Sequence, residues 1–467
     1  MAGKAFPVRQ GETITVEVTG LSHAGEGVGR CQGAVVFLPE VVPGELVRAE
    51  VTEIRKGFAR ARLLEIIRPA PERQEPACAL YGACGGCDLQ HLAYPAQLRW
   101  KAQRVREALA RIGGLTEPPV RETLGMDHPY HYRNKVHLQV GLAEGRIVLG
   151  FYARGSRCVS VRDGQGAGTA CLLVDRELLC LAGTVEELLN RYGARVYAWQ
   201  SRRGYLRHVV LRRARATGEG MVVLVTGREE WVQEAAFVDR LRAAAPEVVS
   251  VVRNINTAEA KEILGPENVV LAGSGTITEI LGPLRFRLGA ASFFQVNPVQ
   301  ALQLCRLVTD YAALTGRETV LDVYCGVGTF GLFLAAGARR VVGIEAVPAA
   351  VADAQTNAAL NGIGNAAFRA GAAEVLIPAL VAEGGRPDVA VLDPPRRGCD
   401  RRVLAALADA NVPRLVYVSC DPATLARDLG YLAARGYVVR DVQPVDMFPH
   451  THHVECVAVA DRGRTVR

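Results

Sequence analysis

Four short apolar segments in the second half of the chain constrain its fold most strongly. They cover residues 320–323, 341–344, 389–392 and 415–418, and stretches rich in Ala and Leu separate them. Short apolar runs that alternate with helical segments are typical of strands buried on both faces of a parallel sheet. We therefore predict a doubly wound, Rossmann-like α/β domain over residues 286–467. Because ligands of such sheets bind at the carboxyl ends of the strands, the residues that follow these segments are the first candidates for a site.

A chain of 467 residues is too long to fold around one hydrophobic core, so we expect further domains before residue 286. Residues 14–18 and 46–54 alternate apolar and polar side chains, with glycine-rich turns between them. This pattern predicts an OB-like β-barrel of five strands over residues 1–68. Residues 69–285 mix β-type runs with helical ones, which predicts an α+β middle domain. Within it, residues 96–113 have helical spacing, and we expect this helix to pack on the C-terminal domain.

Composition points to a cytoplasmic protein that contacts a polyanion. No apolar run reaches membrane-spanning length, and residues 1–16 lack the apolar core of a secretion signal. In a reducing compartment the 12 cysteines are thiols or metal ligands rather than disulfides. Residues 201–216 hold six arginines and no acid, and a basic cluster of this kind can neutralise phosphates. An ordinary solvated surface is the alternative for such a segment.

Three cysteines are clustered near the start of the middle region. Cys78, Cys84 and Cys87 lie close together, and two glycines between the last two let the backbone curl around a bound group. Thiolates at this spacing suit a zinc ion or an iron–sulfur cluster. No fourth ligand is nearby, and the best distant candidates are Cys171 and then Cys158. Three cysteines with a remote fourth favour an iron–sulfur cluster, and zinc remains the alternative.

The first strand of the predicted α/β domain leads into a cofactor-type turn. Residues 322–331 begin with Asp322 and contain three glycines, which let the backbone approach a ligand at a helix N-terminus. Glu345 ends the next strand, where a carboxylate can accept hydrogen bonds from a ribose. The glycines also fit a dinucleotide fingerprint, so a nicotinamide-dependent redox enzyme is a rival hypothesis. Asp322 and the Asp393-Pro394-Pro395 turn favour S-adenosylmethionine, which has a cationic end and no pyrophosphate.

Cys420 is the strongest candidate for a catalytic residue. It ends the fourth apolar segment and precedes an Asp-Pro turn, so we expect the thiol to face a cleft. A buried, inert cysteine is the alternative. Together with nearby carboxylates, the thiol indicates covalent catalysis. We expect positive charge such as that of Arg396 to lower the pKa of this thiol.

In these motifs the chain resembles the RNA uracil-C5-methyltransferase family, and most of all its bacterial 23S ribosomal RNA branch. The resemblance implies that the N-terminal barrel is a TRAM module. Related transfer-RNA enzymes typically lack both that module and the cysteine cluster, which favours ribosomal RNA as the substrate. The matching runs begin at Cys78, Tyr132, Ser292, Asp322, Asp393, Ser419 and His453.

The resemblance also implies a role for each candidate residue. Cys420 would be the nucleophile and Glu455 the base of a C5-methylation that passes through a covalent Cys–C6 adduct. Four residues would bind S-adenosyl-L-methionine: Gln295, Tyr324, Glu345 and Asp393. Four would hold a [4Fe-4S] cluster: Cys78, Cys84, Cys87 and Cys171. Apart from the resemblance, we expect a further set of residues to contact RNA phosphates: Tyr132, Arg133, Lys135 and the arginines of residues 202–215.

The resulting expectation is a monomeric cytoplasmic enzyme that converts a specific uridine of 23S ribosomal RNA to 5-methyluridine. A transfer-RNA uridine-C5 methyltransferase is one alternative. A catalytically silent factor that binds or assembles ribosomal RNA is another, and it would transfer no methyl group.

Overall fold

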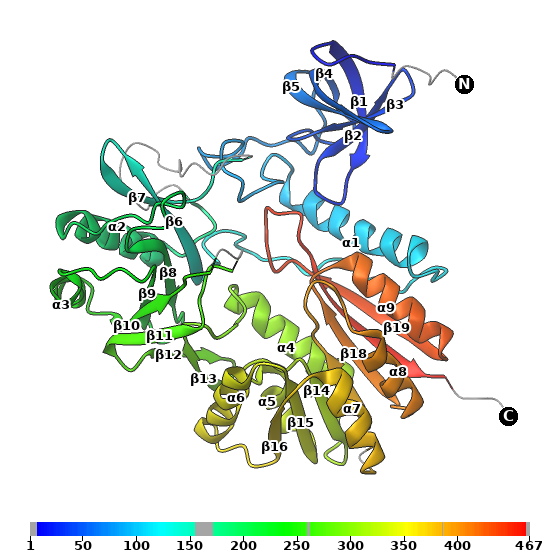
Figure 1. Cartoon of the computed structure of the whole chain (residues 1–467). Helices are drawn as coiled ribbons and strands as arrows, with labels where there is room; N and C mark the ends of the chain where they lie inside the picture. The colour runs from blue at the N-terminus through cyan, green and yellow to red at the C-terminus, as the bar shows by residue number, and fades with distance from the viewer. Residues whose placement is uncertain (1–6, 155–170, 259–261, 385, 464–467) are drawn as a thin grey trace.

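The computed structural model describes residues 7–154, 171–258, 262–384 and 386–463. Its N-terminal part is a closed barrel in which the strands follow the order β1-β2-β3-β5-β4 (Figure 1). Alternation of side chains buries Val16, Val36 and Val47 inside the barrel. Closure leaves the sheet without free edges. The strands are β1 (Thr13–Leu21), β2 (Gly27–Cys31), β3 (Ala34–Leu38), β4 (Leu46–Arg55) and β5 (Phe58–Arg68).

The middle part is a six-stranded sheet in the order β11-β10-β9-β8-β6-β7. Helices α2 (Arg176–Arg191) and α3 (Glu234–Ala244) pack on it around a core that includes Phe237. Asp175 caps α2 by accepting hydrogen bonds from two backbone amides of its first turn. The strands are β6 (Lys135–Ala143), β7 (Arg146–Gly150), β8 (Leu206–Arg213), β9 (Gly220–Thr226), β10 (Val248–Ile255) and β11 (Glu267–Gly273). A two-stranded ribbon, β12 (Thr276–Leu281) and β13 (Leu284–Gly289), follows in the chain.

The C-terminal part is a seven-stranded sheet in the order β16-β15-β14-β17-β18-β20-β19. Its first five strands are parallel, whereas β20 runs antiparallel to both β18 and β19. The strands are β14 (Thr319–Val323), β15 (Arg340–Glu345), β16 (Ala366–Ala370), β17 (Val389–Leu392), β18 (Arg414–Ser419), β19 (Tyr437–Val445) and β20 (Glu455–Arg462). Apolar runs at 320–323, 341–344, 389–392 and 415–418 thus all lie in parallel strands.

Helices cover both faces of this sheet (Figure 1). One face carries α4 (Pro298–Ala312), α5 (Thr329–Ala335) and α6 (Pro348–Leu360). The other carries α7 (Ala373–Ala382), α8 (Arg401–Asp409) and α9 (Pro422–Ala434). Side chains of the two faces form two separate cores, as expected for a sheet buried on both sides.

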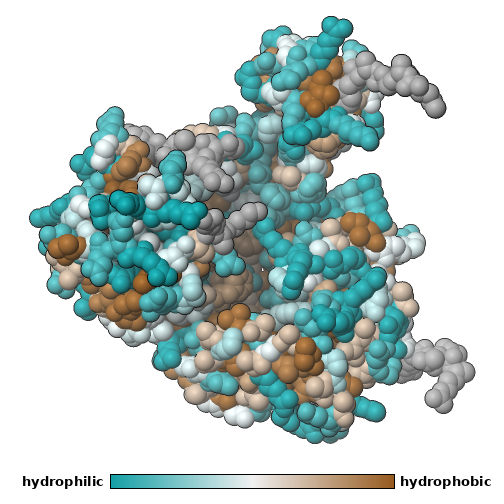
Figure 2. Space-filling view, viewed as in Figure 1, coloured by the Kyte–Doolittle hydropathy of each residue, from teal (hydrophilic) through white to brown (hydrophobic). Residues whose placement is uncertain are grey.

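A helix from early in the chain completes the second face. Helix α1 (Tyr94–Arg111) packs against α9, and its Val105 and Leu109 are fully buried in the same core. Two glycines allow the close approach, since a Cβ added to Gly430 would lie 2.6 Å from the carbonyl oxygen of Gly113. Figure 2 shows the surface hollowed where the three parts of the molecule meet. Among the described residues no helix combines the length and apolar character needed to cross a membrane.

Candidate active site

Cys420 and Glu455 lie opposite each other at one edge of the C-terminal sheet. Cys420 directly follows β18, and Glu455 is the first residue of β20. These strands pair antiparallel with Ser419 opposite Cys456, so one further step along the register brings Cys420 beside Glu455. Cys420 is partly exposed, whereas Glu455 is buried. The edge therefore presents an accessible thiol next to a carboxyl group held inside the protein.

The ionisable groups of this edge influence one another. The pKa of the Cys420 thiol is raised to about 11, chiefly by burial and also by the negative charge of Glu455, while Arg396 opposes both effects. Burial and the charge of Asp393 raise the pKa of Glu455 to about 8. Burial and Asp322 likewise raise the pKa of Asp393 to about 7. Arg396 does lower the pKa of the thiol, as expected, but burial and the neighbouring carboxylates outweigh this single exposed guanidinium, so the net shift is upward.

The turn after β14 holds one residue in an uncommon backbone conformation. Tyr324 adopts a left-handed conformation with φ of 65°, which is uncommon for a residue with a side chain. Asp322 Oδ2 accepts a hydrogen bond of 2.8 Å from the amide of Gly331, and a Cβ at Gly331 would meet that same oxygen. Glu345 Oε2 accepts a hydrogen bond of 3.1 Å from the amide of Gly326. The two carboxylates thus shape the glycine-rich turn from either side.

A cavity of about 350 Å³ opens beside this turn. Glu345, Gly326 and Ser292 are among the residues that line it. The other three residues predicted to bind the cofactor lie outside its lining: Gln295, Tyr324 and Asp393. Two of those remain close to each other, because the amide of Asp393 donates to the carbonyl oxygen of Val323, the residue before Tyr324. Asp322 is fully buried, and among the described residues its Oδ1 has no hydrogen-bond partner.

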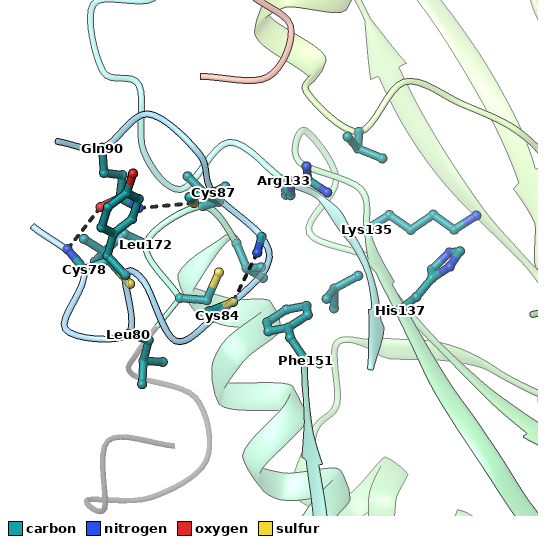
Figure 3. Close-up of a pocket in the computed structure, with 17 residues that line it drawn as sticks. Cys78, Leu80, Cys84, Cys87, Gln90, Arg133, Lys135, His137, Phe151 and Leu172 are labelled. Atoms are coloured by element: carbon teal, nitrogen blue, oxygen red, sulfur yellow. Dashed lines mark hydrogen bonds between the residues drawn. The ribbon is translucent and has the colours of Figure 1, made fainter. Parts of the chain in front are cut away.

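The four predicted cysteine ligands line a second cavity, of about 360 Å³ (Figure 3). Gln90 donates from Nε2 to the sulfur of Cys87 at 3.2 Å, and the amide of Gly86 donates to the sulfur of Cys84 at 3.4 Å. Cys78 and Cys171 complete the set of thiols around the cavity. Within the described ranges no three His, Cys, Asp or Glu side chains are grouped so that they could hold a metal ion. Cys158, the second choice for a fourth ligand, lies outside the described residues.

Comparison with known proteins identifies the family. A family model described as tRNA (Uracil-5-)-methyltransferase matches residues 229–462, and one described as a TRAM domain matches residues 7–64. The chain belongs to the tRNA (uracil-5-)-methyltransferase family. The predicted family, the TRAM barrel and the Rossmann-like C-terminal fold are therefore confirmed.

Two RNA methyltransferases match this chain along nearly its whole length. It is 43% identical to an uncharacterized RNA methyltransferase of Halalkalibacterium halodurans, over 99% of each chain. An uncharacterized RNA methyltransferase of Clostridium acetobutylicum is 40% identical, over 98% of this chain and 99% of the relative. The solved structure of Pyrococcus abyssi tRNA (uracil-54, C5)-methyltransferase in complex with S-adenosyl-L-homocysteine matches with a TM-score of 0.74. That match has 26% identity and covers 96% of this chain and 100% of the other.

Two of the six arginines in the arginine-rich segment have a structural role. Arg212 is buried and donates to the carbonyl oxygens of Gly289 and Ser292, at 3.2 and 3.0 Å. Arg207 is buried too, and Tyr132 is buried with its hydroxyl donating to a backbone carbonyl. The expectation that these three side chains contact phosphates is therefore wrong, because they satisfy carbonyl groups of neighbouring loops. The arginines of the segment that remain exposed are Arg202, Arg203 and Arg215.

A buried ion pair behind the site was not foreseen from the sequence. Lys101 Nζ lies 2.5 Å from Asp446 Oδ1, and both side chains are fully buried. The hydroxyl of Tyr94 donates to the other oxygen of Asp446 at 2.9 Å. A signal was present, because Lys101 falls on the apolar stripe of the helix between Leu98 and Val105. The pair joins α1 to the segment that leads into Glu455.

Replacing Lys101 by alanine is expected to lower the free energy of unfolding by about 3–5 kcal/mol, because Asp446 would stay buried without its counter-charge. Denaturant-induced unfolding measures this change. The matched control is Arg99→Ala, on the same helix as Lys101. It removes an exposed ion pair with Glu72 and should lower the free energy of unfolding by less than about 1 kcal/mol. Equal losses in the two variants would contradict the prediction.

Proposed function

We propose that this family member transfers a methyl group to C5 of a uridine in RNA, with Cys420 as the nucleophile and Glu455 as the base. The observation that carries the proposal is the placement of an accessible thiol beside a buried carboxyl group of raised pKa, at the ligand-binding edge of the sheet. Groups with strongly shifted pKa values at such an edge are typical of catalytic sites.

The residues around the glycine-rich turn fit S-adenosylmethionine as the donor. When bound, S-adenosylmethionine supplies an electrophilic methyl group on a cationic sulfonium. Asp322, with its unpartnered Oδ1, and Asp393 make this edge acidic, which suits a cationic ligand. Glu345 lines the cavity and is the candidate for the ribose hydroxyls. We further assign Tyr324 and Gln295 to this donor, from the motif alone.

Each proposed step assigns work to this chain's own groups. Deprotonated Sγ of Cys420 attacks C6 of the uracil, and the electrons of the C5–C6 double bond move to form an enolate with carbanion character at C5. After C5 gains the methyl group, Glu455 removes the proton that C5 still carries. The C5–C6 double bond reforms, and the bond between Sγ and C6 breaks. A base within folded RNA must leave its stack to reach the thiol.

We infer that 23S ribosomal RNA is the substrate, since the chain carries both the TRAM barrel and the four-cysteine cavity. Transfer RNA is the second candidate, favoured by the match to the tRNA (uracil-54, C5)-methyltransferase of Pyrococcus abyssi. Mapping of 5-methyluridine in both RNAs, from cells with and without the gene, separates the two. We expect a 23S site to lose its methyl group. Loss confined to transfer RNA would refute the ribosomal assignment.

We also propose that Cys78, Cys84, Cys87 and Cys171 hold a [4Fe-4S] cluster. Four thiols line one cavity and are the donor type that such a cluster takes, but in the described ranges they are not grouped closely enough to hold a metal ion, so binding would have to draw them together. Anaerobically purified protein should contain iron and acid-labile sulfide in equal amounts, and Cys87→Ala should lose both. The exposed Cys180 provides the matched control, because Cys180→Ala should retain them. Stoichiometric zinc without sulfide would overturn this proposal.

A further inference from the structure

The loop that leads into Glu455 is held by residues from a distant part of the chain. Residues 446–454, here named the anchor loop, connect β19 to β20. Arg104 of α1 donates to the carbonyl oxygen of His452. Gln97, also on α1, accepts a hydrogen bond of 3.2 Å from the amide of His450. Together with the buried Lys101–Asp446 pair, these contacts fix one side of the loop to α1.

The opposite contact comes from residues 78–89, here named the cysteine-rich segment. Asp88 directly follows Cys87, and its Oδ2 lies 2.7 Å from the ring Nδ1 of His452. The same oxygen accepts a hydrogen bond of 3.3 Å from the amide of His452. The amides of Asp88 and Leu89 both donate to the carbonyl oxygen of His450, each at 3.0 Å. Four contacts therefore join two consecutive residues of the cysteine-rich segment to two residues of the anchor loop.

These contacts continue to the thiol and the base. The rings of His452 and His453 have centroids 4.1 Å apart. His453 Nε2 lies 3.4 Å from a guanidinium nitrogen of Arg396. The positive charge of Arg396 lowers the pKa of both Cys420 and Glu455. Glu455 itself begins two residues after His453 in the chain. A displacement of His452 would therefore move the groups on which the reactive edge depends.

We propose that Asp88 is a positioning residue: by holding His452 it fixes the anchor loop, and with it Glu455 and the His453–Arg396 contact, in the geometry that Cys420 requires. This inference rests on the proposed methyl transfer. The anchor loop is then held between α1 and the cysteine-rich segment, an arrangement here named the clamp. The cysteine-rich segment thus has a structural role in a reaction that moves no unpaired electrons.

Hydrogen exchange of the anchor loop tests the clamp without relying on activity. In Asp88→Ala the amides of residues 446–454 should exchange about tenfold faster, since the loop loses two hydrogen bonds to the carboxylate. His452→Ala removes the ring contact from the other side and leaves the cysteine-rich segment intact, so it gives an answer even if Asp88→Ala folds poorly. Unchanged loop exchange in both variants would overturn the proposal.

Single-turnover methyl transfer at saturating RNA and donor tests the consequence for the reaction. Asp88→Ala should slow this step by roughly 10- to 100-fold, because a small misplacement of catalytic groups has an effect of this size. RNA affinity should stay within about twofold, since no RNA contact is removed. Asp88→Asn should recover most of the rate, because its amide oxygen accepts the same two hydrogen bonds. Equal losses in the alanine and asparagine variants would point to charge rather than position and overturn the proposal.

A control variant and the wild-type protein together distinguish failure of this inference from failure of the proposed function. Glu72→Ala removes a partly exposed acid that lies before Cys78 in the chain, and it should change neither loop exchange nor rate. If wild-type protein forms no 5-methyluridine on either RNA, the proposed function fails, and loop exchange in Asp88→Ala and His452→Ala still decides whether the clamp exists.

Discussion

Replacing Cys420 by alanine will lower methyl transfer by more than about a thousandfold, because the other described cysteines of the C-terminal part are buried and cannot form the bond to C6 in its place. The measurement is incorporation of labelled methyl groups into RNA, followed to completion with excess enzyme. Cys31→Ala, which removes a partly exposed thiol from the barrel, serves as the control and should keep the wild-type rate. Retained turnover in the Cys420 variant would remove the nucleophile from the proposed reaction.

The same variant separates an enzyme from a silent RNA-binding factor. RNA affinity should be unchanged in Cys420→Ala, because the thiol contributes little to the contact area. The covalent protein–RNA adduct that wild-type enzyme forms during turnover should be absent on denaturing gels. A factor without catalytic activity would show no adduct and no transfer in either protein.

Replacing Glu455 by glutamine will arrest the reaction after methylation. Glutamine cannot accept the C5 proton, so the thiolate cannot be eliminated and the methylated adduct should accumulate. Denaturing gels with RNA and labelled donor detect it as a protein band that carries the methyl label. Free, fully methylated RNA at the wild-type rate would show that another group removes the proton. Glu234→Gln, which changes a carboxyl group remote from the site in α3, is the control.

The raised pKa of Glu455 gives this prediction a pH signature. Burial and Asp393 raise the pKa to about 8 from an ordinary value of 4.5, so the deprotonated base becomes more abundant as pH rises through 8. Proton removal in the wild-type enzyme should speed up over that interval and then level off. The folded state also binds this proton more tightly than the unfolded chain, so the residue costs stability increasingly between pH 4.5 and 8. Glu455→Gln should therefore gain stability relative to wild type at pH 9 but not at pH 4.

Local patterns were enough to predict the strands that build the site. The apolar runs that precede Tyr324, Asp393 and Cys420 are short, continuous and flanked by helix signals, so their place in a parallel sheet follows from burial on both faces. The pairing of Cys420 with Glu455 could not be read in this way. It depends on the antiparallel return of β20 beside β18, which no pattern of apolar residues specifies.

The sequence was least informative where residues far apart in the chain meet. Asp88 and His452 are chemically ordinary side chains, and nothing near either of them indicates the other. Arg207 and Arg212 look like surface charges, yet loop carbonyl groups bind them inside the protein. Counting charges in the sequence cannot tell a solvated arginine from a buried one, because both add the same charge to the count. Only the structure shows that a buried arginine donates to backbone carbonyl groups.

The packing of α1 against α9 has a consequence for how the chain matures on the ribosome. Synthesis runs from the N-terminus, so Val105 and Leu109 emerge long before the helix that covers them. Residues 120 and 124 likewise wait for β19, with which they form bridges. The newly made N-terminal half thus exposes an aggregation-prone apolar stripe on α1 until translation is almost finished. Chaperones and proteases should therefore bind stalled or truncated chains readily. The barrel can close as soon as it is made, because all its strands lie within the first 68 residues of the chain.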